Sequence, residues 1–455
     1  MLISSRAVSD RDRELREEIE RRLLDLSARL PTSSLGRLGR SALAALRGGR
    51  VALRLGRGGE KAMPGLDDLV AFVSSVGQLK GMAMKVGQLM SYLDLPLPQE
   101  VRSALAALQT HSPPMPFERV AGIVRTELGE SAAPLLVHME PRPAAAASIG
   151  QVHRARLPDG TDVAVKVQVP GVEEAIAADF RSAAVGTSFV GLLVPGASVD
   201  AIVREARRAV LDECDYRREA RYQERLATLY AGDATLTVPA VVRPYSSRRV
   251  LTTVWAPGLS FDGFLATSPF QADRDRVGAA LFEFYLGSLF RHGLFNWDPH
   301  PGNYIVQPDG RVAMLDHGAT RELDRGFVRK LAALALAVHA DEPEELRRAI
   351  FDLGIVRDGE PRDLETARAL IRSFHGPMLR DEVLAFELGA ATPFRAIASM
   401  KREILRLQLP GEMLFVLRIR FGLMSVLARL GARANWCRLE RQYAADALDR
   451  STHTQ

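Results

Sequence analysis

The chain has 455 residues, of which 47% are hydrophobic and 25% charged, and this length allows two or three domains or one large two-lobed unit. Its net charge of +5 does not favour nucleic acid as a partner, and two cysteines are too few for a disulfide framework. No apolar run reaches the roughly 18 to 20 residues that span a bilayer, so we expect a cytoplasmic protein.

Residues 1–60 form the first predicted segment, which is basic and partly helical. Leu15, Ile19 and Leu23 recur at helical spacing among Arg and Glu, and seven arginines without any acidic residue follow between Asp25 and Glu60. One interpretation is a basic amphipathic segment on an anionic membrane surface, at the inner face of the membrane. The other, which we favour because arginine is abundant throughout, is a solvated segment or a helix docked on the main body.

Residues 61–130 form the second segment, a helical extension. Leu66 to Tyr92 carries apolar residues at nearly every turn, and Pro96 and Pro98 then end the pattern. Pro116 to Leu128 predicts another short helix, which Gly129 ends.

Residues 131–255 form the third segment, in which short β-type runs appear. Gln151 to Leu157 and Asp162 to Val169 flank a Pro-Asp-Gly turn, which is typical of a hairpin. A helical stretch is expected from Glu173 to about Leu229, and strands at 237–243 and 249–255. Residues 256–455 are mostly helical, apart from a loop region at 296–322. The pattern predicts an α+β fold of the two-lobed protein-kinase type: a small β-containing lobe, a larger helical lobe and an N-terminal helical extension.

Asp298, Asn303 and Asp316 are the most informative residues. Asp298 opens the run Asp-Pro-His-Pro-Gly-Asn that ends at Asn303, and Asp316 opens Asp-His-Gly. Kinase-type phosphoryl transfer needs one carboxylate to orient the attacking hydroxyl or water, and an amide oxygen and a second carboxylate to hold Mg²⁺. The ordered trio predicts these roles for Asp298, Asn303 and Asp316 respectively.

Lys166 ends a Val-Ala-Val-Lys strand and is the candidate for contacting the phosphates of ATP. Such a lysine needs a carboxylate on a helix, and Glu219 is our candidate, although a solvent-facing glutamate in an Arg-rich helix stays open. Where a Gly-rich loop is expected, the chain has Ala145, Ala146, Ala147 and Ser148. Alanine restricts the approach of backbone N–H groups to phosphate, so this is either an altered nucleotide loop or the end of an Ala-rich helix. Val254, before the linker at 255–258, completes the predicted nucleotide site.

These residues together resemble the UbiB/AarF family of atypical protein-kinase-like proteins, which includes mitochondrial ADCK proteins linked to coenzyme Q synthesis. The resemblance covers roughly residues 65 to 430. Three motifs carry it: Lys85-Val86-Gly87-Gln88 matches K-x-G-Q, Ala145 to Ser148 matches an alanine-rich loop, and Glu213-Cys214-Asp215 matches E-x-D.

The resemblance implies that Lys166 contacts the α- and β-phosphates of ATP and pairs with Glu219, and that Asn303 and Asp316 bind Mg²⁺. The helix carrying Lys85, Gly87 and Gln88 would fold over the site where a protein substrate docks in ordinary kinases. Glu213 and Asp215 would face that helix, with a Lys85–Glu213 ion pair. Such a lid argues against ordinary protein phosphorylation.

Two departures from the family pattern stand out. His317 occupies the middle of the metal motif, where phenylalanine is usual, and there it either weakens the packing or adds a titratable group. Asn296-Trp297 replaces the common Gln-Thr before Asp298.

The leading hypothesis is an ATP- and Mg²⁺-dependent enzyme, an ATPase or small-molecule kinase, that supports quinone or isoprenoid-lipid metabolism. Its expected partners are ATP, a lipid or quinone-like small molecule, biosynthetic enzymes and a peripheral membrane contact. The alternative is a non-catalytic, ATP-gated regulator or scaffold of a membrane-associated biosynthetic complex.

Overall fold

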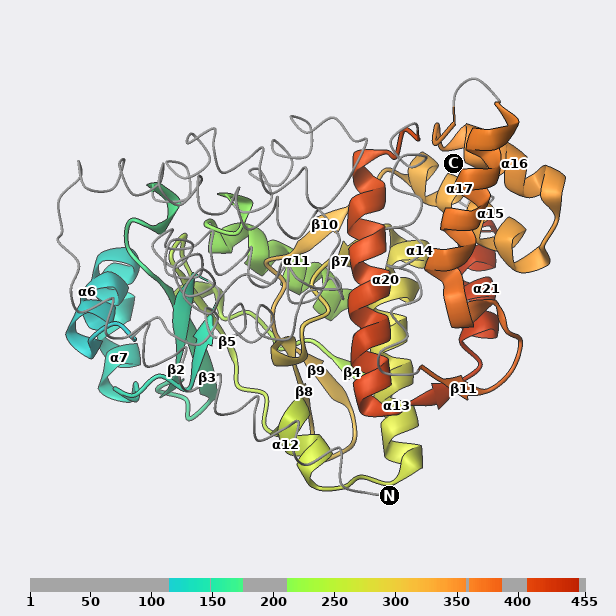
Figure 1. The fold of residues 1–455 in the computed structure, drawn as a ribbon. Helices are drawn as coiled ribbons and strands as arrows, with labels where there is room; N and C mark the ends of the chain where they lie inside the picture. The colour runs from blue at the N-terminus through green and yellow to red at the C-terminus, as the bar shows by residue number, and fades with distance from the viewer. Residues whose placement is uncertain (1–113, 148, 175–210, 357–359, 387–406, 450–455) are drawn as a thin grey trace, which may run out of the picture.

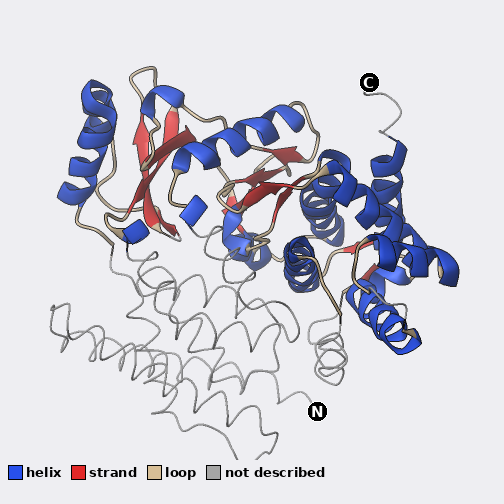
Figure 2. Cartoon of the chain, turned by 90° about the horizontal axis from the view of Figure 1, so that it is seen from above, coloured by secondary structure: helices blue, strands red, loops and turns tan. Residues whose placement is uncertain are grey.

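A computed structural model describes residues 114–147, 149–174, 211–356, 360–386 and 407–449. A β-sheet flanked by helices comes first, and a larger part made mostly of helices follows it (Figure 1, Figure 2). This confirms the predicted α+β class with a β-containing N-terminal lobe and a helical C-terminal lobe. The boundaries of the four predicted segments stay predictions, and most of the helical extension lies outside the described residues.

The N-terminal lobe is built on an antiparallel sheet of order β1-β2-β3-β5. Its strands are β1 (Ala145–Ala147), β2 (Gly150–Arg156), β3 (Asp162–Gln168) and β5 (Val250–Val254). Its helices are α6 (Phe117–Leu128), the 3₁₀ turn η1 (Gly129–Ser131), α7 (Ala132–Val137) and α11 (Tyr216–Leu229), with the 3₁₀ turn η2 (Arg243–Tyr245) before β5. The predicted hairpin is confirmed, with Gly160 at φ +87° in its turn, and so is the helix that ends at Gly129.

Alternation along β3 separates the core of this lobe from its functional face. Val163, Val165 and Val167 are fully buried in one cluster with residues of α6 and α7. Successive side chains of a strand point to opposite faces of the sheet, so Lys166 points the other way. There its ammonium lies 5.1 Å from the ring centroid of Tyr216, at the start of α11. Burial of the three valines therefore fixes the face from which Lys166 extends.

Two sequence expectations were wrong in detail, and one alternative that the sequence left open is excluded. Residues 145–147 form a strand, so the Ala-rich helix end is excluded. The segment expected as one strand at 237–243 is divided: β4 (Leu236–Thr237) pairs with β9 (Val312–Met314) of the other lobe, and Val241 forms an isolated bridge to Thr253 of β5. Pro239 lies between the two pairings and cannot donate to a ladder. The helix expected to run to Leu229 is interrupted at 213–215, because Asp215 caps α11 by accepting a hydrogen bond from the Arg217 backbone N–H at 3.1 Å.

The C-terminal lobe combines short strands near the lobe junction with helices that form its core. Its strands are β6 (Leu259–Ser260), β7 (Leu294–Asn296), β8 (Tyr304–Val306), β9 (Val312–Met314), β10 (Thr320–Glu322), β11 (Leu384–Ala385) and β12 (Arg433–Ala434). Its α-helices are α12 (Phe261–Ala266), α13 (Gln271–Phe282), α14 (Ser288–His292), α15 (Arg325–Ala340), α16 (Pro343–Asp352), α17 (Pro361–His375), α20 (Gly411–Leu430) and α21 (Trp436–Asp449). A π-helical segment, η3 (Glu283–Gly287), joins α13 to α14, and 3₁₀ turns occur at η4 (Pro301–Asn303) and η5 (Gly376–Leu379).

The strands of this lobe form small sheets of order β4-β9-β8-β6, β10-β7 and β11-β12. The region expected as a loop at 296–322 thus contains β8, β9 and β10. Among the residues that the structure describes, no helix is both long enough and apolar enough to cross a membrane.

A buried ionic cluster ties the C-terminal helices together. Arg420 of α20 pairs with Glu440 of α21, and Glu440 also contacts the His339 Nε2 of α15 at 2.9 Å. His375, at the end of α17, is 4% exposed, and its Nδ1 lies 2.9 Å from the Ile371 carbonyl. Burial, together with the charge of Arg420, lowers the pKa of His375 to about 3. His375 is therefore folded into the core as a neutral ring.

This burial predicts a pH dependence of stability. Between pH 6.5, the ordinary pKa of histidine, and about 3, the unfolded chain binds a proton at His375 that the folded chain does not. The free energy of unfolding should therefore fall as the pH is lowered through this window, by up to about 1.4 kcal/mol per pH unit from this residue. Urea titrations at several pH values between 4.5 and 7 should show that the free energy of unfolding depends less steeply on pH in His375→Phe than in the parent. His138→Gln, which changes a histidine at an exposed position, is the control and should show the same dependence on pH as the parent.

Candidate functional site

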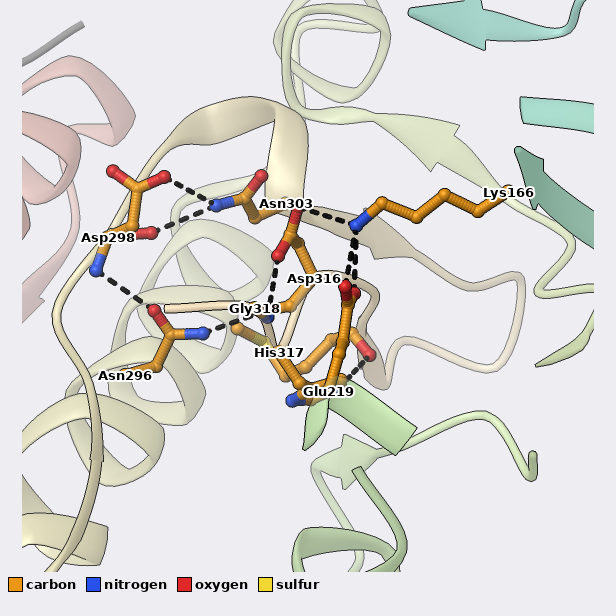
Figure 3. Close-up of polar contacts among 9 residues, drawn as sticks. Lys166, Glu219, Asn296, Asp298, Asn303, Asp316, His317 and Gly318 are labelled. Atoms are coloured by element: carbon orange, nitrogen blue, oxygen red, sulfur yellow. Dashed lines mark hydrogen bonds and ion pairs between the residues drawn. The ribbon is translucent and has the colours of Figure 1, made fainter. Parts of the chain in front are cut away.

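The ammonium group of Lys166 contacts carboxylates from both lobes. Lys166 Nζ donates to both carboxylate oxygens of Glu219, at 2.8 and 3.0 Å, and lies 3.4 Å from Asp316 Oδ2 (Figure 3). Lys166 comes from β3, Glu219 from α11, and Asp316 from the loop after β9. The side chains of Lys166 and Glu219 are only 15% and 3% exposed. The structure thus brings together three of the residues predicted from the sequence.

The cluster contains one ammonium and two carboxylates, and this imbalance shifts the pKa values of Lys166 and Glu219. Burial favours neutral lysine, but the negative charges of Asp316 and Glu219 outweigh it and raise the pKa of Lys166 well above its usual value. Burial raises the pKa of Glu219 to about 7 against the attraction of Lys166, and the nearby charge of Asp316 adds to the rise. Lys166 is therefore a cation that two carboxylates share.

Backbone hydrogen bonds hold Asp316 in its loop. The Gly318 N–H donates to Asp316 Oδ1 at 2.9 Å, and the Asn296 side chain donates to the Asp316 carbonyl at 2.7 Å. The Leu315 N–H donates to the Asn303 carbonyl at 2.8 Å. These bonds fix the two predicted metal-binding residues on adjoining segments.

Asn303 has its amide oriented by Asp298. Its Nδ2 donates to the Asp298 carbonyl at 3.0 Å and to Asp298 Oδ2 at 3.3 Å, which directs Oδ1 away from Asp298 (Figure 3). An amide oxygen and a carboxylate are the hard oxygen donors that suit Mg²⁺, which commonly takes one or two carboxylates and completes its shell with phosphate and water. The described residues contain no cluster of three or more His, Cys, Asp or Glu that could hold a metal ion. Asn303 and Asp316 therefore fit Mg²⁺ bound together with a nucleotide.

Asp298 is buried and paired with an arginine that the sequence analysis missed. Arg418 Nη2 donates to Asp298 Oδ1 at 2.7 Å, and Arg418 Nε donates to the Trp297 carbonyl at 2.9 Å. The guanidinium carbon also lies 4.5 Å from the Trp297 ring centroid. Arg418 occurs in an apolar stretch, and a buried arginine in such a stretch requires a carboxylate partner. The sequence could therefore have predicted that Arg418 pairs with a carboxylate, but it does not show which one.

One face of α20 packs against the segment that carries Trp297, Asp298 and Pro299. The Phe415 ring lies 5.6 Å from the Trp297 ring, and Phe415, Arg418 and Gly422 share this face at helical spacing. A Cβ added at Gly422 would lie 2.4 Å from Pro299 Cγ, so glycine permits the close approach. Helix α20 thus packs against Asp298 and the two residues that flank it.

Comparison with known proteins identifies the family. Residues 107–350, which are more than half of the chain, match the ABC1 atypical kinase-like domain model. This chain belongs to the ABC1/AarF/UbiB family of atypical kinases.

Individual relatives agree with this assignment. AarF domain-containing protein kinase 1 of Xenopus tropicalis is 29% identical over 78% of this chain and 69% of its own length. Activity of BC1 complex kinase 8, chloroplastic, of Arabidopsis thaliana is 31% identical over 72% of this chain and 45% of its own. Atypical kinase COQ8, mitochondrial, of Schizosaccharomyces pombe is 30% identical over 79% of this chain and 60% of its own length. The chain therefore spans less than two thirds of the latter two relatives.

A solved structure also matches this ABC1-family chain. It is the complex of Rv3197 with erythromycin from Mycobacterium tuberculosis, which is 28% identical with a TM-score of 0.57. The match covers 81% of this chain and 93% of that chain. The likeness extends through both lobes rather than being confined to the motifs.

His317, where this ABC1-family chain departs from the usual phenylalanine, is a neutral core residue. Its side chain is fully buried, its Nε2 lies 3.0 Å from the Met314 carbonyl, and its ring centroid lies 6.2 Å from that of Phe284. Burial lowers the pKa of His317 to about 4. It therefore packs beside the π-helical segment much as an aromatic side chain would. The neighbouring Tyr285 in the same segment donates to the Asp298 carbonyl at 3.3 Å.

The remaining family motifs are only partly within the described residues. Lys85, Gly87, Gln88 and Ser148 lie outside them, so the Lys85–Glu213 pair stays a prediction. Glu213 is 6% exposed, and its Cγ would lie 3.7 Å from a Cβ added at Gly318. Asp215 caps α11 and pairs with Arg217, and whether it also faces the K-x-G-Q helix stays a prediction.

The other predicted nucleotide contacts within the described residues lie on the two edge strands of the sheet, β1 and β5. Ala145 and Ala146 are exposed on β1, and Ala147 is half-buried beside them. Val254, at the end of β5, is 36% exposed. Their contact with a nucleotide stays a prediction.

The buried Asp298–Arg418 pair predicts a large effect on stability. Arg418→Met should lower the free energy of unfolding by about 3 kcal/mol, because it leaves the Asp298 carboxylate buried without its cation. Arg429→Met on the same helix is the matched control, because the Arg429–Asp262 pair is 41% and 76% exposed and should contribute less than about 1 kcal/mol. Urea denaturation measures both. Equal losses in the two variants would contradict the special role of Arg418.

Proposed function

We propose that this protein binds ATP with Mg²⁺ between its lobes and transfers the γ-phosphoryl group to water or to the hydroxyl of a small molecule. The observation that carries the proposal is the shared ammonium of Lys166, bonded to Glu219 at 2.8 Å and 3.4 Å from Asp316. A lysine held by a helix carboxylate and adjoining a metal carboxylate is the arrangement that phosphoryl transfer by kinases requires. Family membership adds that the domain is atypical kinase-like.

Each of these residues has a distinct task in the proposed reaction. Lys166 contacts the phosphates, and Glu219 holds the ammonium in place. Asn303 and Asp316 bind Mg²⁺, which supplies charge neutralisation at the phosphates. Asp298 orients the acceptor hydroxyl or water. Electrostatic stabilisation of the developing charge by prepositioned groups supplies most of the rate effect.

The chemical balance of the step is simple. The bond between the γ-phosphorus and the oxygen that bridges it to the β-phosphate breaks, and a bond forms between that phosphorus and the acceptor oxygen. ADP leaves with the bridging oxygen. The acceptor proton passes to Asp298 or to a product phosphate oxygen and then to solvent. The reaction needs no further co-reactant.

We propose a lipid-like or quinone-like acceptor in quinone or isoprenoid-lipid metabolism. Its support is the family relationship, which includes the COQ8 atypical kinase of S. pombe, and the structural match to a protein in complex with erythromycin, a small molecule. Such an acceptor suits a cytoplasmic protein in peripheral contact with the inner face of a membrane, near biosynthetic enzymes. The basic residues 1–60 would supply charge for that contact under the membrane-surface interpretation, the less favoured of the two given for this segment.

A second candidate is an ATP-gated regulator without turnover. The observation that favours it is the state of Asp298, which is 6% exposed and has one carboxylate oxygen bonded to Arg418 at 2.7 Å. A carboxylate oxygen that accepts a hydrogen bond from a buried guanidinium is less available to orient an acceptor hydroxyl or water. Nucleotide binding without turnover would then close the lobes and present a surface to a partner complex.

Asp316→Asn should abolish Mg²⁺-dependent ATP hydrolysis, because it removes the metal carboxylate. Phosphate release is measured with and without anionic liposomes. Asp309→Asn, in an exposed turn, is the control and should keep the parental rate. Turnover that survives in Asp316→Asn would sink the metal assignment. No turnover in the parent, together with thermal stabilisation by Mg²⁺ and ATP, would favour the regulator.

Ala146→Gly should tighten nucleotide binding by about threefold or more, because removing the β-carbon allows closer approach of the β1 backbone to phosphate. Calorimetry with Mg²⁺ and a non-hydrolysable ATP analogue measures the Kd. Ala231→Gly, in the exposed turn after α11, is the control and should bind as the parent does. An unchanged Kd for Ala146→Gly would remove the alanine strand from the nucleotide site.

A further inference from the structure

The strand β10 follows the loop that carries Asp316, the proposed metal-binding loop, and its side chains contact the region of α11, the helix that carries Glu219. It begins two residues after Gly318 and pairs with β7, so that Thr320 lies opposite Asn296 and Arg321 opposite Phe295. Both loops that carry the proposed catalytic and metal-binding residues therefore meet at this small sheet. From it, the side chains of Arg321 and Glu322 reach across to the α11 region.

The inner contact is a shared carboxylate. Asp212 Oδ2 lies 3.0 Å from Arg218 Nη2 and 3.4 Å from Arg321 Nη2. Asp212 is in the last turn before the break that starts α11, and Arg218 is the residue directly before Glu219. The side chains of Asp212 and Arg321 are 18% and 14% exposed, so solvent screens this contact only partly. The charge of Glu213 also attracts Arg321.

The outer contact joins the same two elements but is open to solvent. Arg225, two turns farther along α11, donates to both carboxylate oxygens of Glu322 at 2.8 and 3.1 Å. These side chains are 47% and 51% exposed. Exposed pairs contribute little, so the inner contact carries most of the coupling between β10 and α11.

We propose that Asp212 and Arg321 form an ionic clamp between β10 and the start of α11, where Asp212 also contacts Arg218. The clamp positions α11 so that Glu219 pairs with Lys166 when β10 is in place. Arg321 is thereby a positioning residue that acts through Glu219 and touches neither nucleotide nor metal. Other contacts also hold α11: Tyr216 and Ala220 pack in one apolar cluster with the sheet, the Gln223 side chain donates to the Pro239 carbonyl at 2.7 Å, and Glu224 pairs with Arg243. Among the ion pairs between the α11 region and β10, the Asp212–Arg321 contact is the less exposed to solvent. This inference rests on the proposed nucleotide site.

The test compares Arg321→Met with Arg225→Met, which remove the inner and outer contacts by the same chemical change. The full chain is titrated by calorimetry with Mg²⁺ and a non-hydrolysable ATP analogue. Arg321→Met should raise the Kd about tenfold, because Lys166 loses its aligned partner, whereas Arg225→Met should stay within about twofold of the parent. Thermal unfolding confirms that each variant is folded at the temperature used.

A double variant separates positioning from general damage. Asp212→Asn leaves Arg218 and Arg321 close together without their carboxylate, so it should bind more weakly than Arg321→Met. Adding Arg321→Met to Asp212→Asn should recover part of that loss, because the repulsion between the two guanidinium groups is gone. A merely structural defect would instead add the two losses.

Amide hydrogen exchange supplies a readout that needs no nucleotide. Residues 216–229 should exchange faster in Arg321→Met than in the parent or in Arg225→Met. If the parent binds no nucleotide, the proposed function fails and hydrogen exchange alone decides on the clamp. If the parent binds but Arg321→Met has the same Kd and the same exchange rates, the clamp is wrong while the proposed function stands.

Discussion

One buried cation shared by two carboxylates is the constraint on which the site depends. Lys166, Glu219 and Asp316 come from β3, α11 and the loop after β9, and Glu219 and Asp316 lie 53 and 150 residues after Lys166. Each of the three elements must be placed correctly for the contact to exist. The buried valines orient β3, the Asp215 cap starts α11 at Tyr216, and the Gly318 backbone holds Asp316. The site is therefore a product of both lobes rather than of either one.

The helical lobe supports the site through arginines on one helix. On α20, Arg418 reaches Asp298 and Arg420 reaches Glu440 of α21. Both pairs are almost fully buried, where an unpaired charge is costly. Two residues apart, these side chains leave the helix on different sides, so α20 is fixed between the segment that carries Asp298 and the helical core. Its glycine at 422 allows the backbone to approach Pro299.

Much of the architecture was predictable because local chemistry determined it. The hairpin around Gly160, the helix that ends at Gly129 and the linker after β5 all follow from residues with strong conformational preferences. The pairing of Lys166 with Glu219 was foreseeable only as one option, since spacing alone also allowed an exposed glutamate. Arg418 was missed because a long-range partner of a buried charge leaves no local pattern. The strand at Ala145–Ala147 was ambiguous for a related reason: alanine favours a helix in isolation, and pairing with β2 overrides that preference.

The balance of charge explains why metal and nucleotide belong together in the proposed function. Two cations, Lys166 and Arg418, face three carboxylates, Glu219, Asp298 and Asp316, which leaves one excess negative charge. Burial raises the pKa of Glu219 to about 7 against the attraction of Lys166, and the charge of Asp316, which shares that cation, adds to the rise. A nucleotide alone would add negative charge to the cluster. In the proposed function, a divalent cation at Asp316 would offset the negative charge of both the cluster and the nucleotide, so each ligand would make the binding of the other more favourable.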